Sequence, residues 1–322
     1  MTNQAGRQTK AISRIGIVMP CYNLGEYIDD AIKSLQKQTL QDFTVVLTDD
    51  GSTDKKTIAK LQSLQLPSNY TVHLETANSG MNKIVNKYAH KLSCEYLLVF
   101  SADDMLKPTY LEETSRFLDT YSDYAAVSTW LQYTGAAKGI RKYNPTKTSL
   151  PAMLLQNNFC GSALIRKTVW DQLGGYATDP SQKVHQDYEL WLRVLESGEK
   201  LGIIEEPLFL YRIRDVSASH MLNSKTEEAW VRYVMRQHAA LYRQYGNEII
   251  ADLWIKNIQN SINYAETLKG HEWLDSEYKK LTKQVESLAA QNSEMSLKLQ
   301  KIEANPVFRI ALKMRRLLKH RS

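Results

Sequence analysis

The sequence predicts an α/β protein built on a doubly wound, mostly parallel sheet. Short apolar runs rich in β-branched or aromatic residues alternate with segments of helical periodicity through the first half of the 322-residue chain. Turn residues bound each apolar run. This order of strand and helix is typical of βαβ units, in which successive strands pair in parallel around a crossover helix.

Four strands and three helices are expected in the first half. The strands are expected over 15–19, 43–47, 70–74 and 96–100, and the helices over 24–35, 57–64 and 81–92. Pro108 suits the first turn of the helix that follows, where its missing N–H costs nothing.

The second half has a more mixed pattern. Strands are expected over 125–130, 162–165 and 208–213, helices over 167–173 and 187–196, and a loop over 135–145. Gly174 and Gly175 are expected to end the first of these helices. From 225 to 268 the pattern is helical, with a break expected near Gly246.

Residues 274–302 carry a seven-residue repeat. One set of repeat positions, assigned to d, is Leu274, Leu281, Leu288, Met295 and Ile302, and the other, assigned to a, is Tyr278, Val285, Asn292 and Leu299. About four uninterrupted heptads predict a coiled coil, and an asparagine at an a position favours two strands in one register. The alternative is a single amphipathic helix packed on the domain, although such a helix drifts off a strict seven-residue period.

The net charge of +6 belongs to the C-terminal tail. Residues 306–322 hold six basic residues and no acidic residue, so basic and acidic residues balance in the rest of the chain. This distribution argues against a nucleic-acid-binding face. On a helix the tail would be basic and amphipathic, which suits an anionic membrane surface. A frayed basic terminus without a partner is the alternative.

Compartment signals point to the cytoplasm. Cys21, Cys94 and Cys160 are an odd, sparse set without paired spacing, which is typical of a reducing compartment. The first ten residues are polar, and no apolar run approaches the roughly 18 residues of a membrane span. We expect a cytoplasmic protein that lies peripherally on the inner face of the cell membrane.

Two acidic clusters follow directly after two of the expected strands. The first is Asp49-Asp50-Gly51-Ser52-Thr53-Asp54, and the second is Ser101-Ala102-Asp103-Asp104. Ligands of an open parallel sheet bind beyond the carboxyl ends of its strands, so both clusters are expected to face one crevice. Carboxylates that close repel each other unless a cation, such as a divalent ion carrying phosphates, lies between them.

These clusters and three further motifs resemble, in order, the motifs of family-two inverting glycosyltransferases. The further motifs are Pro20-Cys21-Tyr22-Asn23, Asn78-Ser79-Gly80 and Gln186-Asp187-Tyr188-Glu189-Leu190-Trp191. The resemblance covers roughly residues 12–220 and implies a GT-A fold, with a Rossmann-like nucleotide half and a mixed acceptor half. Ser101 departs from it, because the family's metal motif usually begins with an aspartate.

The resemblance, the heptad repeat and the basic tail together divide the chain into four segments. A GT-A domain is expected over 1–222, a helical extension over 223–270, the coiled coil over 271–305 and the basic tail over 306–322.

The resemblance implies a metal site and a catalytic base. Asp103 and Asp104 would hold Mn²⁺ or Mg²⁺, although they could instead cap the helix near Pro108. Asp187 would take the proton of the acceptor hydroxyl. Glu189 is its rival, since side chains two apart on a helix point about 200° apart, and a helix cap is the other explanation of Asp187. Trp191 is expected in the core.

The implied donor site draws on several strand ends. Its residues are Pro20, Tyr22, Asn23, Asp49, Asp50, Asn78, Asp103, Arg212, Arg214 and His220. Asp50 is favoured over Asp49 for the base or ribose. The alternative is a turn at Asp50-Gly51 with Ser52 or Asp54 capping the next helix, and both can be true at once. Tyr22 would stack on the base or simply pack. Arg212 and Arg214 would meet phosphate, as would His220 unless it is a solvated loop residue within 216–222.

The favoured function is an inverting, metal-dependent glycosyltransferase in surface polysaccharide synthesis. It would move a sugar from a nucleotide-diphosphate sugar to a hydroxyl of a glycan or lipid-linked acceptor, and it would assemble as a homo-oligomer through 274–302. The alternative is a non-catalytic nucleotide-sugar or glycan binding module that acts through its coiled coil. A dinucleotide oxidoreductase is set aside, because Pro20 to Gly25 lack the required glycine fingerprint.

Overall fold

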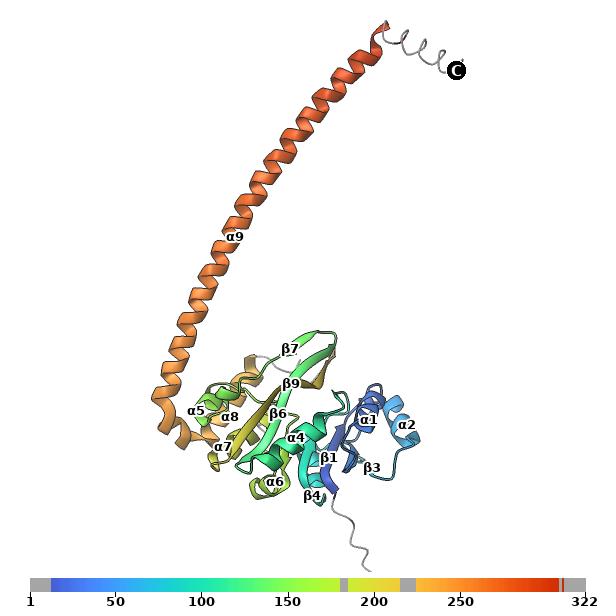
Figure 1. The fold of residues 1–322 in the computed structure, drawn as a ribbon, viewed down its shortest axis with the longest axis vertical. Helices are drawn as coiled ribbons and strands as arrows, with labels where there is room; N and C mark the ends of the chain where they lie inside the picture. The colour runs from blue at the N-terminus through green and yellow to red at the C-terminus, as the bar shows by residue number, and fades with distance from the viewer. Residues whose placement is uncertain (1–12, 180–184, 215–223, 307–308, 310–322) are drawn as a thin grey trace, which may run out of the picture. The chain divides into compact units, whose positions relative to one another are not determined.

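The computed structural model describes residues 13–179, 185–214, 224–306 and 309. The chain divides into two compact units, with the boundary between Ala251 and Asp252. The first unit contains the sheet, and the second contains most of the long C-terminal helix (Figure 1).

Four parallel strands form the nucleotide half, as the sequence predicts. They are β1 (Ser13–Cys21), β2 (Phe43–Asp49), β3 (Tyr70–Leu74) and β4 (Cys94–Val99), in the spatial order β3-β2-β1-β4. The connecting helices are α1 (Ile28–Gln36), α2 (Lys55–Ser63) and α3 (Met81–Ala89). From β1 to β2 the chain moves toward the β3 edge of the sheet, whereas from β3 to β4 it crosses β2 and β1 in the opposite direction. Right-handed crossovers therefore put α1 and α3 on opposite faces.

The other half of the same sheet is mixed. Within the described residues the strand order continues from β4 as β8 (Leu164–Arg166), β6 (Tyr124–Gly135), β9 (Lys200–Ile213) and β5 (Met105–Leu106), with β7 (Gly139–Arg141) beside β6. β8 pairs antiparallel with both β4 and β6, whereas β6 and β9 pair in parallel. The helices of this half are α4 (Tyr110–Thr120), α5 (Leu150–Leu155), α6 (Lys167–Leu173) and α7 (Gln186–Glu196), with a short 3-10 turn at Pro145–Lys147.

Two local predictions in this region were wrong. The segment 135–145 is not only a loop, because β7 turns back and pairs with β6, placing Arg141 opposite Leu131. Gly135 and Gly139 make the turn possible, since both adopt positive φ angles. Pro108 also lies before its helix rather than in it, because α4 begins at Tyr110.

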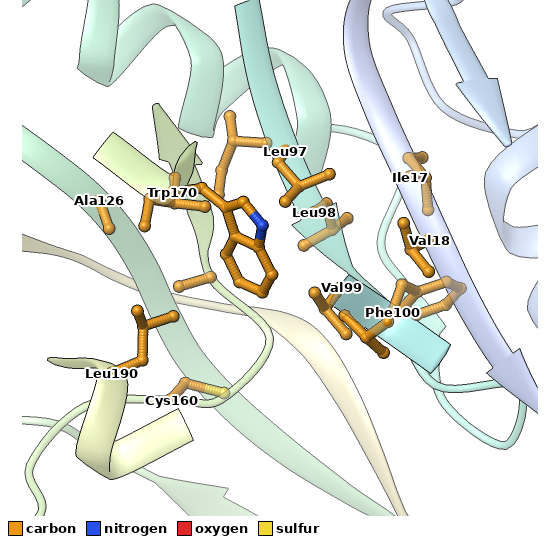
Figure 2. Close-up of a cluster of buried hydrophobic side chains, with 14 of the residues drawn as sticks. Ile17, Val18, Leu97, Leu98, Val99, Phe100, Ala126, Cys160, Trp170 and Leu190 are labelled. Carbon is orange, nitrogen blue, oxygen red and sulfur yellow. The ribbon is translucent and has the colours of Figure 1, made fainter. Parts of the chain in front are cut away.

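A single hydrophobic core joins the two halves of the sheet. Figure 2 shows the indole of Trp170, from α6, beside Leu97 and Leu98 of β4, with Ala126 of β6 on its other side. Trp170 is only 1% exposed. The strand-end loops that carry the acidic clusters are therefore anchored on a rigid scaffold.

The C-terminal helices differ from the prediction at Gly246. α8 (Ser224–Gln237) and α9 (Ala239–Ala304) are separated at His238, whereas Gly246 lies inside α9. A single glycine costs a helix only about 1 kcal/mol, which the burial of Leu241 and Ile249 offsets. Trp230 and Tyr233 of α8 are part of the core of the first compact unit.

α9 displays two separate apolar stripes in the second unit. The heptad side chains between Leu274 and Ile302 are each at least 48% exposed, apart from the polar Asn292. Ile255, Ile258 and Ile262 form an earlier exposed stripe. Ile258 and Leu274 are sixteen residues apart, which places them about 160° apart around the helix axis. The heptad seam therefore does not continue into the earlier stripe.

Candidate functional site

One cavity of the first unit gathers part of the predicted site. It has a volume of about 520 Å³ and lies where the ends of β4 and β9 meet the start of α7. Its lining includes Ser101, Asp103, Asp104, Asp187 and Arg214, which the sequence analysis discussed as site residues. The expected metal pair and the expected base therefore face the same space.

The Asp103–Asp104 pair is held by backbone and arginine contacts. Asp104 accepts a hydrogen bond from the backbone N–H of Arg212, with 2.9 Å between N and Oδ1. The hydroxyl of Ser101 donates to Asp103. Arg214 Nε lies 2.7 Å from Asp103 Oδ2 in an ion pair, although its N–H is not aligned for a hydrogen bond. Neither carboxylate caps α4, whose N-cap residue is Thr109.

The donor set of this pair fits a hard divalent cation. Burial and the adjacent charge of Asp103 raise the pKa of Asp104 well above its ordinary value, although Arg212 and Arg214 act in the opposite direction. The pair thus retains uncompensated negative charge when both carboxyls ionise. Across the described residues, no group of three or more His, Cys, Asp or Glu side chains is placed to hold a metal. Mg²⁺ sites, however, commonly use one or two carboxylates and complete their shell with substrate phosphates and water.

Asp187 lies in the first turn of α7 and points at Gly161. A Cβ atom on Gly161 would come within 2.7 Å of Asp187 Oδ2. Only glycine at position 161 therefore avoids a steric clash with the carboxylate of Asp187. Burial raises the pKa of Asp187, while His185, nearby backbone N–H groups and Arg141 lower it. A carboxylate with a raised pKa is better suited to accept a proton than an ordinary aspartate.

Glu189, the alternative candidate for the base, is paired with an arginine outside the cavity. It is 3% exposed and forms a bidentate ion pair with Arg193, with separations of 2.8 Å and 2.7 Å. Arg193 also donates to the carbonyl groups of Leu173 and Gly175, so this network ties α7 to the end of α6. Glu189 does not line the cavity. Trp191 is a core residue, as expected, and packs edge-on against Phe159.

Asp49 and Asp50 are buried and already have partners within the protein. Asp49 accepts from the backbone and the hydroxyl of Ser52. Asp50 accepts from the backbone N–H groups of Ser79 and Gly80, at 2.8 Å and 2.9 Å, and so holds the loop that leads into α3. Gly51 has a φ of +69° and faces the backbone of Asn78. The turn explanation is therefore correct, and the helix cap it proposed is Asp54.

Four other predicted donor residues, Pro20, Tyr22, Asn23 and Asn78, do not line this cavity. Pro20 is buried at the end of β1, whereas Tyr22 is 43% exposed and Asn78 is exposed. Asn23 has a φ of +56° and accepts from the backbone N–H groups of Thr53 and Asp54, which joins the loops after β1 and β2.

The two arginines of β9 differ in their surroundings. Arg214 lines the cavity, whereas Arg212 is turned toward α1, where Nη2 lies 2.8 Å from Asp30 Oδ2. Arg212 Nε also donates to the carbonyl oxygen of Asp103. His220 and the loop 216–222 lie outside the described residues.

Several cavity residues were not expected from the sequence. Arg141 and Tyr143 come from the hairpin after β6, and His185 is the N-cap residue of α7 with a φ of +58°. Tyr133 and Tyr211 line the cavity from the facing strands β6 and β9. A stricter reading of the alternation in 131–141 as a hairpin could have found Arg141.

Comparison with known proteins relates this domain to one family. The family model of Glycosyl transferase family 2 matches residues 16–174. This segment is therefore similar to glycosyltransferase family 2 domains. An uncharacterized glycosyltransferase of Methanocaldococcus jannaschii is 22% identical over 253 residues, which cover 73% of this chain and 82% of the relative. The minor teichoic acid biosynthesis protein GgaB of Bacillus subtilis is 25% identical over 67% of this chain, but the match spans only 25% of GgaB.

The solved structures agree on the fold of the glycosyltransferase domain. TarS of S. aureus, in complex with UDP-GlcNAc, superposes with a TM-score of 0.57 at 18% identity, covering 70% of this chain and 65% of TarS. The mixed sheet with C-terminal helices is thus a GT-A-like fold, as predicted. Relatives named as glycosyltransferases do not favour the non-catalytic binding module.

The raised pKa of Asp187 predicts a pH-dependent gain in stability for Asp187→Asn. Because the folded pKa exceeds the unfolded value, ionisation destabilises the fold as the pH rises from below about 3.9. Asparagine cannot ionise, so the difference in Tm between variant and wild type should grow from acid to neutral pH in calorimetry.

Asp123→Asn provides the matched control for this measurement. Asp123 is exposed, and its hydrogen bond with Lys200 lowers the pKa of its carboxyl. The control should therefore lose stability relative to wild type as the pH rises. A Tm difference for Asp187→Asn that is flat with pH would contradict the burial argument.

Proposed function

We propose that this chain is a metal-dependent, inverting glycosyltransferase. It moves a sugar from a nucleotide-diphosphate sugar to a hydroxyl group of a glycan or lipid-linked acceptor. The observation that carries the proposal is the single cavity lined by Asp103, Asp104 and Asp187. An acidic pair for the leaving diphosphate and a separate base are the two chemical groups that direct sugar transfer needs.

Asp187 acts as the general base of this reaction. Its carboxylate accepts the proton of the acceptor hydroxyl as the oxygen attacks the anomeric carbon and the bond to the diphosphate breaks. Direct attack from the side opposite the leaving group inverts the anomeric centre. Retention with a covalent intermediate would need a carboxylate nucleophile on the sugar, and the engagement of Glu189 with Arg193 leaves it unsuited to that role.

Asp103 and Asp104 would hold the divalent cation. When bound, the cation neutralises the charge that develops on the leaving diphosphate. Arg214 adds a positive charge on the same side of the cavity. The Ser101 hydroxyl orients Asp103, so serine at this position supports the carboxylate rather than supplying a third one.

The nucleotide is proposed to lie toward the ends of β1 and β2. Tyr22 is exposed there and offers a stacking face, and Asn78 lies on the neighbouring loop that Asp50 holds. Asp49, Asp50 and Asn23 act mainly by shaping these loops. A role in polysaccharide synthesis is suggested by the likeness to GgaB, which is named for minor teichoic acid biosynthesis.

Assembly as a homo-oligomer is proposed to use the seam 274–302 of α9, with a second copy of the chain as the partner. A row of exposed apolar side chains on a long helix is stabilised by burial against an equivalent row. In a parallel pair Asn292 would face its own counterpart. Lys298 at a g position would face Glu303 of the other chain at an e position, which adds charge complementarity.

Membrane association is proposed for the basic segment 306–322. Apart from Pro306 and Arg309 this segment lies outside the described residues. Across the part of the chain that the structure describes, no helix combines the length and apolarity that crossing a bilayer requires. Peripheral attachment at the inner face of the membrane would bring the site to a lipid-linked acceptor.

Asp187→Asn should lower the rate of sugar transfer by about 10²–10⁴-fold, because a neutral amide cannot take the acceptor's proton. Donor affinity should stay near the wild-type value, since the change is close to isosteric. Asp123→Asn is the control and should transfer normally. Near-wild-type transfer by Asp187→Asn would remove this residue from the base role.

A chelator should abolish transfer, and Asp104→Asn should weaken donor binding in the presence of Mn²⁺. The amide oxygen of asparagine can still accept from the backbone of Arg212, so the variant removes charge while preserving the fold. Donor titration by calorimetry measures the effect. Full turnover in chelator would mean that Arg214 and its neighbours neutralise the diphosphate without a metal.

Asn292→Leu should raise the thermal stability of the assembly and loosen its oligomer number, as removal of a buried asparagine does in coiled coils. Ser293→Leu, one residue on and outside the seam, is the control and should leave the oligomer number unchanged. Deletion of 271–322 should leave a folded monomer. Sedimentation of the full-length protein as a monomer at micromolar concentration would rule out the seam.

A further inference from the structure

The positively charged side chains that line the cavity differ in their partners. Arg214 is paired with Asp103, and His185 Nε2 lies 2.9 Å from Glu227. Arg141 forms no ion pair or side-chain hydrogen bond with any residue that the structure describes. Arg141 is exposed and lines the cavity, so its guanidinium is available to a ligand.

Arg141 is held in place by an aromatic ring instead of a carboxylate. Its guanidinium carbon lies 4.9 Å from the ring centre of Tyr143. Tyr143 is 5% exposed, and its carbonyl oxygen accepts from the indole of Trp130, so the ring is fixed. A guanidinium that stacks on a ring keeps its in-plane N–H donors free, in the fork geometry that matches an oxyanion.

The position of Arg141 relates it to the base rather than to the acidic pair. The cations that act on the Asp104 carboxyl are Arg214 and Arg212, and Arg141 is not among them. Arg141 and His185 lower the pKa of Asp187 instead. The cavity thus has one set of positive groups on the donor side and another beside the base.

We propose that Arg141 binds an anionic group of the acceptor, a phosphate or a carboxylate, next to the hydroxyl that Asp187 deprotonates. The proposal rests on the proposed glycosyl transfer, because it assigns the acceptor side of that reaction. It makes the acceptor a polyanionic chain, such as one with phosphodiester links or uronic acid units. The oxyanion would accept hydrogen bonds from the free N–H groups of Arg141, and its fixed position would align the neighbouring hydroxyl.

Binding measurements on the full-length protein test this proposal. The probes are a glycerol-phosphate oligomer, an oligogalacturonate and a neutral malto-oligosaccharide of similar length. Wild type, Arg141→Ala, Arg141→Lys and Lys142→Ala are compared at fixed salt. Lys142 is the matched control, because it lies over the ring of Trp130 and does not line the cavity. The basic tail is common to all variants, so its contribution cancels.

Arg141→Ala should weaken binding of one or both anionic probes by about 10–100-fold, the loss expected for a charge-assisted pair. The affinity of Arg141→Lys for these probes should lie between those of wild type and Arg141→Ala, since lysine keeps the positive charge but lacks the paired N–H donors of the guanidinium. The probe that responds identifies phosphate or carboxylate as the group. Equal weakening by Lys142→Ala, an equal loss with the neutral probe, or no loss at all would overturn the proposal.

Donor hydrolysis separates this inference from the proposed function. Arg141→Ala should leave the affinity for the nucleotide sugar unchanged, and a loss of donor affinity would assign Arg141 to the diphosphate. A wild-type protein that hydrolyses no nucleotide sugar, but still binds an anionic probe through Arg141, would overturn the glycosyl transfer and leave the anion site standing.

Discussion

The site depends on the contacts that Arg212 makes with the loop after β4. Its backbone N–H is bonded to Asp104, its Nε to the carbonyl group of Asp103, and its terminal nitrogen to Asp30 of α1. These bonds connect the mixed half of the sheet to the parallel half at the point where the acidic pair lies. Without them, two adjacent carboxylates in a buried loop would be unstable, since burial already opposes ionisation of Asp104.

These tertiary contacts explain which features of the site could be predicted from the sequence and which could not. The motifs singled out Asp103, Asp104, Asp187 and Arg214, which line one cavity, because each lies at the end of an apolar run or at the start of a helix. The sequence could not assign the roles of Arg212 and Asp50, whose partners are set by tertiary contacts. Arg212 bonds to a residue 108 positions away, and Asp50 to Ser79 across the sheet edge. Residue types that suit a ligand suited the protein's own backbone equally well.

The acceptor side was the least predictable part of the site. The cavity there is lined by Arg141 and Tyr143, from a segment whose glycines suggested only a loop. Positive φ angles at Gly135 and Gly139 allow a tight hairpin instead, and pairing with β6 places Arg141 at the rim of the cavity. Short irregular strands carry little periodicity, so such a cavity wall emerges only from the fold. Similarly, Gly246 suggested a helix break that packing of its neighbours prevents.

The account divides the cavity between a donor side at Asp103, Asp104 and Arg214 and an acceptor side at Asp187 and Arg141. The most direct test is a crystal structure with Mn²⁺ and the nucleotide sugar that the protein binds best in a screen. We predict the diphosphate beside Asp103 and Asp104, with the anomeric carbon exposed toward Asp187. A nucleotide bound away from the acidic pair, or a sugar whose anomeric carbon faces away from Asp187, would contradict the account.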